Sequence, residues 1–181
     1  VDAVLVQDIG VATIAQEIVP DLPLHASTQM TIHNREGVAQ AERKGFSRVV
    51  LARELTLAEI EDIIETSEIG IEVFAHGALC YGYSGQCLLS SVIGGRSGNR
   101  GMCAQPCRKP YRLVTAEMDE HCRPGDLQVV PTEGDYLLST RDLAVYPDLD
   151  RLARTPVACL KIEGRMRSAE YVATVGSIYR H

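Results

Sequence analysis

The sequence contains no tryptophan, only two phenylalanines and no long apolar run. A membrane-spanning helix needs about 20 consecutive apolar residues. A secretory signal needs a basic start followed by an apolar segment, and neither pattern is present. With 45% hydrophobic and 23% charged residues, the chain has the composition of a soluble globular domain. We therefore expect a cytoplasmic protein with no membrane segment.

Short apolar runs recur at a nearly constant interval, with helix-like segments between them. Thr56 and Glu59 form a capping-box pattern at the start of the clearest helix, and Asn34 is a candidate N-cap of another. A last helix is expected from Ser168 to Arg180. Its apolar stripe comprises Tyr171, Val172, Val175, Ile178 and Tyr179. The predicted strands begin at Val1, Pro23, Arg48, Ile69, Asp135 and Ala158.

Nearly every predicted strand ends in polar side chains. An open doubly wound sheet concentrates such residues at one switch point, whereas a barrel has them at the end of each strand. The pattern therefore favours an α/β fold of the modified (β/α)8 TIM type. The strand-end residues are Gln7, Asp8, Ser27, Thr28, Gln29, Arg53, Glu54, His76, Arg141, Asp142, Lys161, Glu163 and Arg165.

Only about six of the roughly eight strands of such a barrel can be identified. The chain also lacks a starting methionine, and its first segment, VDAVLVQD from Val1, already has the character of a buried strand. We expect residues 1–181 to be the C-terminal three-quarters of the barrel, with the first two units supplied by a missing N-terminal segment. An insertion rich in Gly, Cys, Pro and Arg covers about 78–134, and excursions of that length are usually functional.

Four sequence blocks carry a family resemblance. They are EVFAHGALCYGYSGQCLLSS from Glu72, GMCAQPCRKPY from Gly101, YLLSTRDL from Tyr136 and LKIEGRMRSAEYV from Leu160. These blocks resemble, in the same order, those of peptidase family U32, the collagenase-like proteins. The upstream segments VDAVLVQD and LHASTQM are similar to barrel strands of that family. The resemblance implies a modified eight-stranded barrel, in agreement with the strand pattern.

The resemblance leaves two reactions open. It implies either a peptidase, for which the family offers no assigned mechanism, or an oxygen-independent hydroxylase of RNA bases or quinone precursors that carries an iron–sulfur cluster. These activities belong to different classes, so the residues themselves must decide between them.

Four cysteines cluster in the insertion, at positions 80, 87, 103 and 107. Without signs of secretion, clustered cysteines indicate metal binding or redox chemistry rather than disulfides. Thiolates are soft ligands that suit zinc or an iron–sulfur cluster. Cys80, Cys87, Cys103 and Cys107 are therefore the candidate metal ligands. Cys122 and Cys159 are expected to have no such role, since Cys159 lies within an apolar strand.

The ligand set departs from the family pattern at one position. The resemblance implies a further cysteine just after the STRDL block, where this chain has Ala144. A site of four thiolates must then include Cys107, or another group completes it. His76 is the reserve ligand, since it lies four residues before Cys80 at a strand end. A homodimer that shares the site across a twofold axis is a further possibility.

Acidic residues are absent from Leu88 to Thr115, although the chain as a whole has a net charge of −6. Such a net charge argues against nonspecific nucleic-acid binding by the whole chain, while this segment is locally basic. Glycines and arginines together suit the binding of an anionic substrate such as RNA. The alternative interpretation of this segment is a solvated loop. The candidate substrate-binding residues are Arg53, Arg96, Arg100, Arg108 and Lys109.

Catalytic candidates come from the strand ends. No serine or cysteine peptidase signature and no HExxH motif is present. Glu163 and Lys161 can serve as base and charge partner, with Asp142, Arg141 and Arg165 beside them, although a structural ion-pair network would have the same composition. We therefore rank a metal-dependent or iron–sulfur hydroxylase first. A metal-dependent peptidase and a zinc-stapled dimer module without activity are the alternatives.

Overall fold

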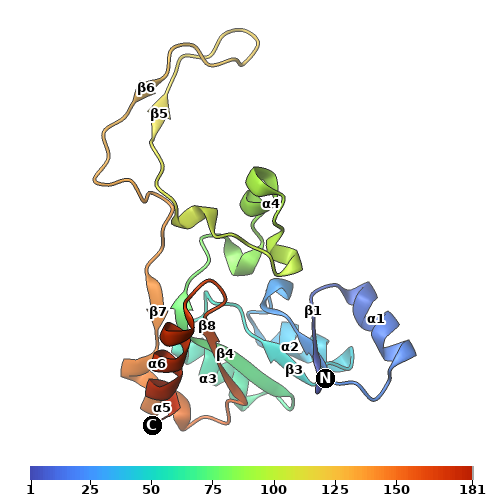
Figure 1. Ribbon diagram of the computed structural model, residues 1–181. Coiled ribbons are helices and arrows are strands. Elements are labelled where there is room, and N and C mark those ends of the chain that lie inside the picture. The colour runs from blue at the N-terminus through green and yellow to red at the C-terminus, as the bar shows by residue number, and fades with distance from the viewer. Residues whose placement is uncertain (181) are drawn as a thin grey trace.

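The computed structural model describes residues 1–180, and its main element is a six-stranded, mostly parallel sheet (Figure 1). The strands follow in the order β1-β2-β3-β4-β7, and β8 also pairs with β4. All pairs are parallel except β4 with β7. The strands of this sheet are β1 Val4–Val6, β2 Leu24–Ala26, β3 Arg48–Val50, β4 Gly70–Ala78, β7 Asp142–Ala144 and β8 Cys159–Glu163.

The prediction of an α/β fold with a parallel sheet is confirmed. Within residues 1–180 the sheet remains open, because β1 and β8 do not pair with each other. Five predicted strands coincide with β1, β2, β3, β4 and β8; β4 is shifted by one residue and the other four are shorter than predicted.

Helices lie between the strands as the sequence pattern predicts. Asp8 Oδ1 accepts a hydrogen bond from the Val11 amide at the start of the first helix. Asn34 Oδ1 accepts one from the Gly37 amide at the start of the second. The capping box of Thr56 is confirmed. The α-helices are α1 Ile9–Ile18, α2 Arg35–Arg43, α3 Leu57–Glu65, α4 Leu89–Gly94, α5 Leu149–Ala153 and α6 Ala169–Arg180. Single 3-10 turns cover Thr28–Met30, Tyr83–Gly85, Gly98–Arg100, Pro106–Arg108 and Tyr146–Asp148.

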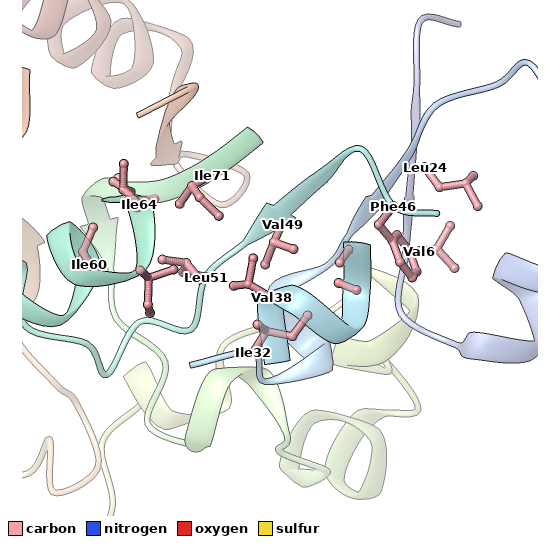
Figure 2. Close-up of a cluster of buried hydrophobic side chains, with 14 of the residues drawn as sticks. Val6, Leu24, Ile32, Val38, Phe46, Val49, Leu51, Ile60, Ile64 and Ile71 are labelled. Atoms are coloured by element: carbon pink, nitrogen blue, oxygen red, sulfur yellow. The ribbon is translucent and has the colours of Figure 1, made fainter. Parts of the chain in front are cut away.

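The hydrophobic core lies between the sheet and the helices α2 and α3. Figure 2 shows Val38 and Ile60 from these helices directed toward Val49 and Ile71 of the strands. All four side chains are buried. Because this core holds β2, β3 and β4 in place, it also fixes where their carboxyl ends lie.

The predicted strand at Asp135 is wrong for most of its length. Residues 135–141 form no strand and contain a single turn at Leu137 and Leu138, and only Asp142–Ala144 joins the sheet, antiparallel to β4. The reason is topological. The insertion leaves β4 at its carboxyl end and returns to that same end, so the chain enters the sheet in the opposite direction without the crossover that a parallel strand needs.

The predicted apolar stripe of the last helix is only partly correct. Val175 is buried, but Val172 and Ile178 are 41% and 45% exposed. Tyr171 and Tyr179 are half-buried, since they pack on His76 of β4 and not inside the main core.

The insertion contains a long hairpin that extends away from the sheet (Figure 1), and we call residues 111–135 the arm. Its paired strands are β5 Val114–Thr115 and β6 Gln128–Val129. No side chain of residues 112–137 is buried. None of the helices within residues 1–180 has the length and apolar character required to cross a membrane.

Candidate functional site

A cavity of about 410 Å3 lies at the carboxyl ends of the parallel strands. Parallel strands bring their carboxyl ends to one edge, so the polar residues that follow them meet there. Ligand sites commonly have volumes of roughly 300–1,000 Å3. The residues of the strands and of the segments just after them that line this cavity include Gln7, Ser27, Thr28, Gln29, Arg53, Phe74, Ala78, Lys161, Glu163 and Arg165.

All four predicted cysteine ligands, which come from the insertion, line the same cavity. Each is half-buried and carries a free thiol. Two of the sulfurs accept backbone hydrogen bonds. The Leu89 amide lies 3.4 Å from Cys87 Sγ, and the Gln105 amide lies 3.3 Å from Cys103 Sγ.

Burial raises the pKa of the Cys107 thiol above its ordinary value, and negative charge on the nearby Cys80 raises it further. The Arg108 guanidinium and the Tyr81 backbone amide act in the opposite direction. Cys80 and Cys103 are therefore close enough to Cys107 to raise the pKa of its thiol. Within residues 1–180, however, no three His, Cys, Asp or Glu side chains are arranged as the ligands of a metal ion.

His76, the reserve ligand, does not line the cavity, and its ring packs on Tyr179 at 5.5 Å between centroids. Tyr179 Oη donates to the Ala75 carbonyl at 2.9 Å, so it accepts at 3.2 Å from Nδ1–H of His76. Burial raises the pKa of Tyr179. In the sheet register, His76 is paired with Ala144, the position where the family resemblance implies a cysteine.

Arg53 and Glu163 are brought together in the cavity, as the sequence predicts. A guanidinium nitrogen of Arg53 lies 3.9 Å from Glu163 Oε2, and the guanidinium lies 4.2 Å from the centre of the Phe74 ring. Arg53 Nε is buried and has no hydrogen-bond partner among residues 1–180. The guanidinium is therefore held by an aromatic face, one carboxylate and the Ala78 carbonyl at 3.4 Å, while its Nε–H is still free to donate.

Lys161 has a partner that the sequence reasoning missed. Its ammonium lies 3.0 Å from Glu72 Oε1, and Arg48 approaches the other carboxylate oxygen of Glu72 at 3.5 Å. Glu72 is only 6% exposed. No pattern marked Glu72 as functional, because in the sequence it is one acidic residue inside an apolar run.

The other predicted catalytic residues are separated. Arg165 lines the cavity and donates to the carbonyl oxygens of Gly101 and Cys103, so it is bound to the loop that carries Cys103. Asp142 lies outside the cavity lining and forms ion pairs with Arg108 and Arg167. Arg141 is exposed and does not line the cavity.

The basic segment divides into two groups. Arg108 lines the cavity but donates to the Leu79 carbonyl, to Ser139 Oγ and to Thr140, and it also pairs with Asp142 at 3.1 Å. Its predicted role in substrate binding therefore competes with a structural one. Arg100 is exposed and lines the cavity. Arg96, bonded to the Met102 carbonyl at 3.0 Å, and Lys109 are exposed outside the lining.

Comparison with known proteins gives a family match along the entire chain. The sequence profile of "Peptidase family U32" matches residues 1–181. "tRNA hydroxylation protein P1" of Bacillus subtilis is 36% identical over 99% of this chain and 42% of its own length. "23S rRNA 5-hydroxycytidine C2501 synthase" of Escherichia coli is 42% identical over 99% of this chain and 26% of its own length. "Collagenase" of Porphyromonas gingivalis is 34% identical over 99% of this chain and 44% of its own length.

The chain thus spans less than half the length of these relatives. Among solved structures, the U32 peptidase Mk0906 has a TM-score of 0.38 and 20% identity over 43% of this chain and 32% of its own. That likeness is too low to bear on the fold.

Proposed function

The chain belongs to peptidase family U32, and from this membership we propose that it carries the active face of an enzyme that hydroxylates bases in RNA. The observation that carries the proposal is the composition of the cavity. It combines four free thiols with an excess of basic over acidic side chains. The charged residues in its lining are Arg53, Arg100, Arg108, Lys161, Glu163 and Arg165.

The excess of positive charge suits a substrate with phosphate groups. RNA backbones bind to arginine and lysine side chains, and the bases can enter pockets only after they leave the stack. A cavity of about 410 Å3 has the size of a small-ligand site. Two relatives that align with 99% of this chain are named for tRNA hydroxylation and for synthesis of a hydroxylated rRNA base.

The donor set fits an iron–sulfur cluster, and zinc is the alternative occupant. Cys80, Cys87, Cys103 and Cys107 supply four soft ligands in one cavity. We favour Cys107 over His76 as the fourth ligand, because the His76 ring packs against Tyr179 outside the cavity lining. A bound iron–sulfur cluster would supply one-electron chemistry.

The remaining residues bind and orient the substrate. Arg53 and Arg100 would hold an anionic group of the substrate, with Arg53 fixed by the Phe74 ring. Glu163 is the candidate proton acceptor, and Lys161 is held beside it by Glu72. Arg165 holds the loop that carries Cys103 against the strand ends.

We also propose that further strands complete a barrel at the β1 edge. The first helix presents Val11, Ile14 and Ile18 to solvent at 54%, 55% and 72% exposure. Unpaired strand edges beside exposed apolar surface are normally covered in folded proteins. A relative more than twice the length of this chain has enough additional sequence to supply strands that cover the β1 edge and these apolar side chains.

Peptide hydrolysis is the second candidate, since one relative is named "Collagenase". Its weakness as a cysteine peptidase is that no histidine among the described residues lies beside the thiols. A cysteine nucleophile needs a neighbouring imidazole, whereas the cavity lining contains four cysteines and no histidine among residues 1–180. A metal shared between two copies of the chain, without catalysis, is the third possibility.

A paired assay on the full-length protein, purified and reconstituted without oxygen, tests the proposal. We expect bound iron and sulfide, and retention of RNA that weakens steeply as salt rises. Zinc with cleavage of peptides would instead support the peptidase. Zinc shared between chains with neither activity would support the dimer module.

A further inference from the structure

A carboxylate clamps the turn that joins Cys80 to Cys87. Glu54, in the segment between β3 and α3, accepts a hydrogen bond from the Ser84 amide on Oε1 at 2.6 Å. Its other oxygen, Oε2, accepts the Ser84 hydroxyl at 2.5 Å. Ser84 is fully buried, at 0% exposure. Both donors of this buried residue are therefore satisfied by one side chain from a different part of the chain.

The clamped residue adopts a backbone conformation that it would not choose by itself. Ser84 has φ 41°, in the left-handed region that side chains other than glycine disfavour. The neighbouring glycines show how tightly the turn closes. Gly85 has φ 80°, and a Cβ added at Gly82 would lie 2.7 Å from Cys87 Cβ. The backbone of the turn is thus folded against one of the two cysteines.

The same turn is tied to the loop that carries Cys103. Gln86 Nε2 donates to the Gln29 carbonyl at 2.5 Å, and Gln29 Nε2 donates to the Gly98 carbonyl at 2.7 Å. Gln29 and Glu54 follow neighbouring strands, β2 and β3. The loops that carry Cys87 and Cys103 are therefore anchored to the ends of the strands, and the anchor on Ser84 is a carboxylate.

We propose that Glu54 is a positioning residue that sets the separation and orientation of the Cys80 and Cys87 thiols. The inference rests on the proposed metal role of these cysteines. Hydrogen bonds to an ionised carboxylate are stronger than those between neutral groups, so they can hold a backbone in a disfavoured conformation. Without Glu54, the buried Ser84 amide loses its partner and the turn relaxes. The thiols then bind a soft metal ion less tightly.

Titration of the full-length apoprotein with Cd²⁺ tests the clamp, because cadmium–thiolate bonds give an ultraviolet absorption band. We expect Glu54→Gln and Glu54→Ala to weaken Cd²⁺ binding by about 10- to 100-fold, the loss typical of groups that orient metal ligands. Glu65→Gln, the same chemical change at an exposed position on α3, should leave the affinity unchanged.

A rescue variant separates positioning from general damage. Glycine adopts positive φ without strain, so Ser84→Gly placed in the Glu54→Ala protein should recover part of the lost affinity. Unchanged Cd²⁺ affinity in a folded Glu54→Ala protein would overturn the proposal, as would failure of the rescue. If Glu54→Ala does not fold, Glu54→Gln gives the same comparison.

Thiol reactivity distinguishes failure of the clamp from failure of the metal site. If the wild-type protein binds no Cd²⁺, the proposed metal role fails. The clamp is then judged by how fast a disulfide reagent modifies Cys80 and Cys87. Faster modification in Glu54→Ala than in Glu65→Gln supports the clamp, and equal rates remove it.

Discussion

The carboxylate of Glu72 lies between two cations from neighbouring strands, 3.0 Å from the Lys161 ammonium and 3.5 Å from the Arg48 guanidinium. The Glu72 side chain is 8% exposed, whereas those of Lys161 and Arg48 are 29% and 31% exposed. The buried member of the cluster is therefore the anion, and the cations retain contact with water. Lys161 therefore lines the cavity with its position fixed by the sheet.

Replacing Glu72 by glutamine should destabilise the protein. Loss of a buried ion-pair partner costs up to about 3–5 kcal/mol when the remaining charge is fully buried. Because Lys161 and Arg48 are each partly solvated, we expect about 1–2 kcal/mol. Urea unfolding measures this loss. Glu61→Gln, which breaks the more exposed pair with Arg151, is the matched control and should cost less than Glu72→Gln. Equal losses in the two variants would contradict the buried role of Glu72.

Cysteine replacements should separate ligands from bystanders. Cys103→Ser should abolish bound metal, because a hydroxyl is a poor substitute for a thiolate ligand. Cys159→Ala should retain the metal and affect only packing. Cys122→Ser, on the exposed arm, is a second control. Metal analysis after anaerobic purification makes the comparison, and full metal content in Cys103→Ser would remove that residue from the site.

Lys109 gives the cleaner test of RNA binding by the basic segment, because Arg108 also makes structural contacts. Lys109 is exposed, so Lys109→Gln should reduce the slope of log affinity against log salt by about one. Lys44→Gln, an equal charge change at the end of α2, should leave the slope unchanged. Removing Arg108 as well should lower the slope by about two in total, and it also breaks the contacts with Thr140 and Asp142. Equal slopes for all the variants would rule out RNA contact by this segment.

The apoprotein should lose stability in alkaline solution through Cys107. Burial raises the pKa of its thiol above the ordinary value of 9.0, so the native state holds this proton more tightly than the unfolded chain does. The free energy of unfolding should therefore fall as pH rises from the ordinary thiol pKa toward the raised one. Urea unfolding across this pH window measures the fall, and Cys107→Ser should remove it. A fall of the same size in that variant would assign the effect to another group.

The sequence predicts the strands and helices that surround the site better than the contacts within it. Alternating apolar segments and the caps at Asn34 and Thr56 are local signals, and the corresponding strands and helices form as expected. Polar strand ends correctly indicate where Arg53, Lys161 and Glu163 meet. The apolar run from Tyr136 misleads, because the chain there returns from the arm and Tyr136 is 62% exposed.

Long-range partners account for the residues that the sequence could not interpret. Arg108 has the charge expected of a substrate-binding residue, yet its hydrogen bonds extend to Leu79 and Thr140, far away in the chain. Glu54 was recognised only as a polar strand end, and its hold on Ser84 spans 30 residues. Such contacts depend on how the loops fold over the sheet, and no periodic pattern records them.

The exposed arm gives the molecule a natural place to be cut. Proteases attack loop tips that have few buried contacts, and no side chain from 112 to 137 is buried. A single cleavage there would leave Arg108 on one fragment and Asp142 on the other, still joined at 3.1 Å across the break. β4 and β7 would likewise belong to different fragments and remain paired. The nicked protein should therefore behave as a non-covalent complex of two pieces, with all four cysteines of the cavity on the first.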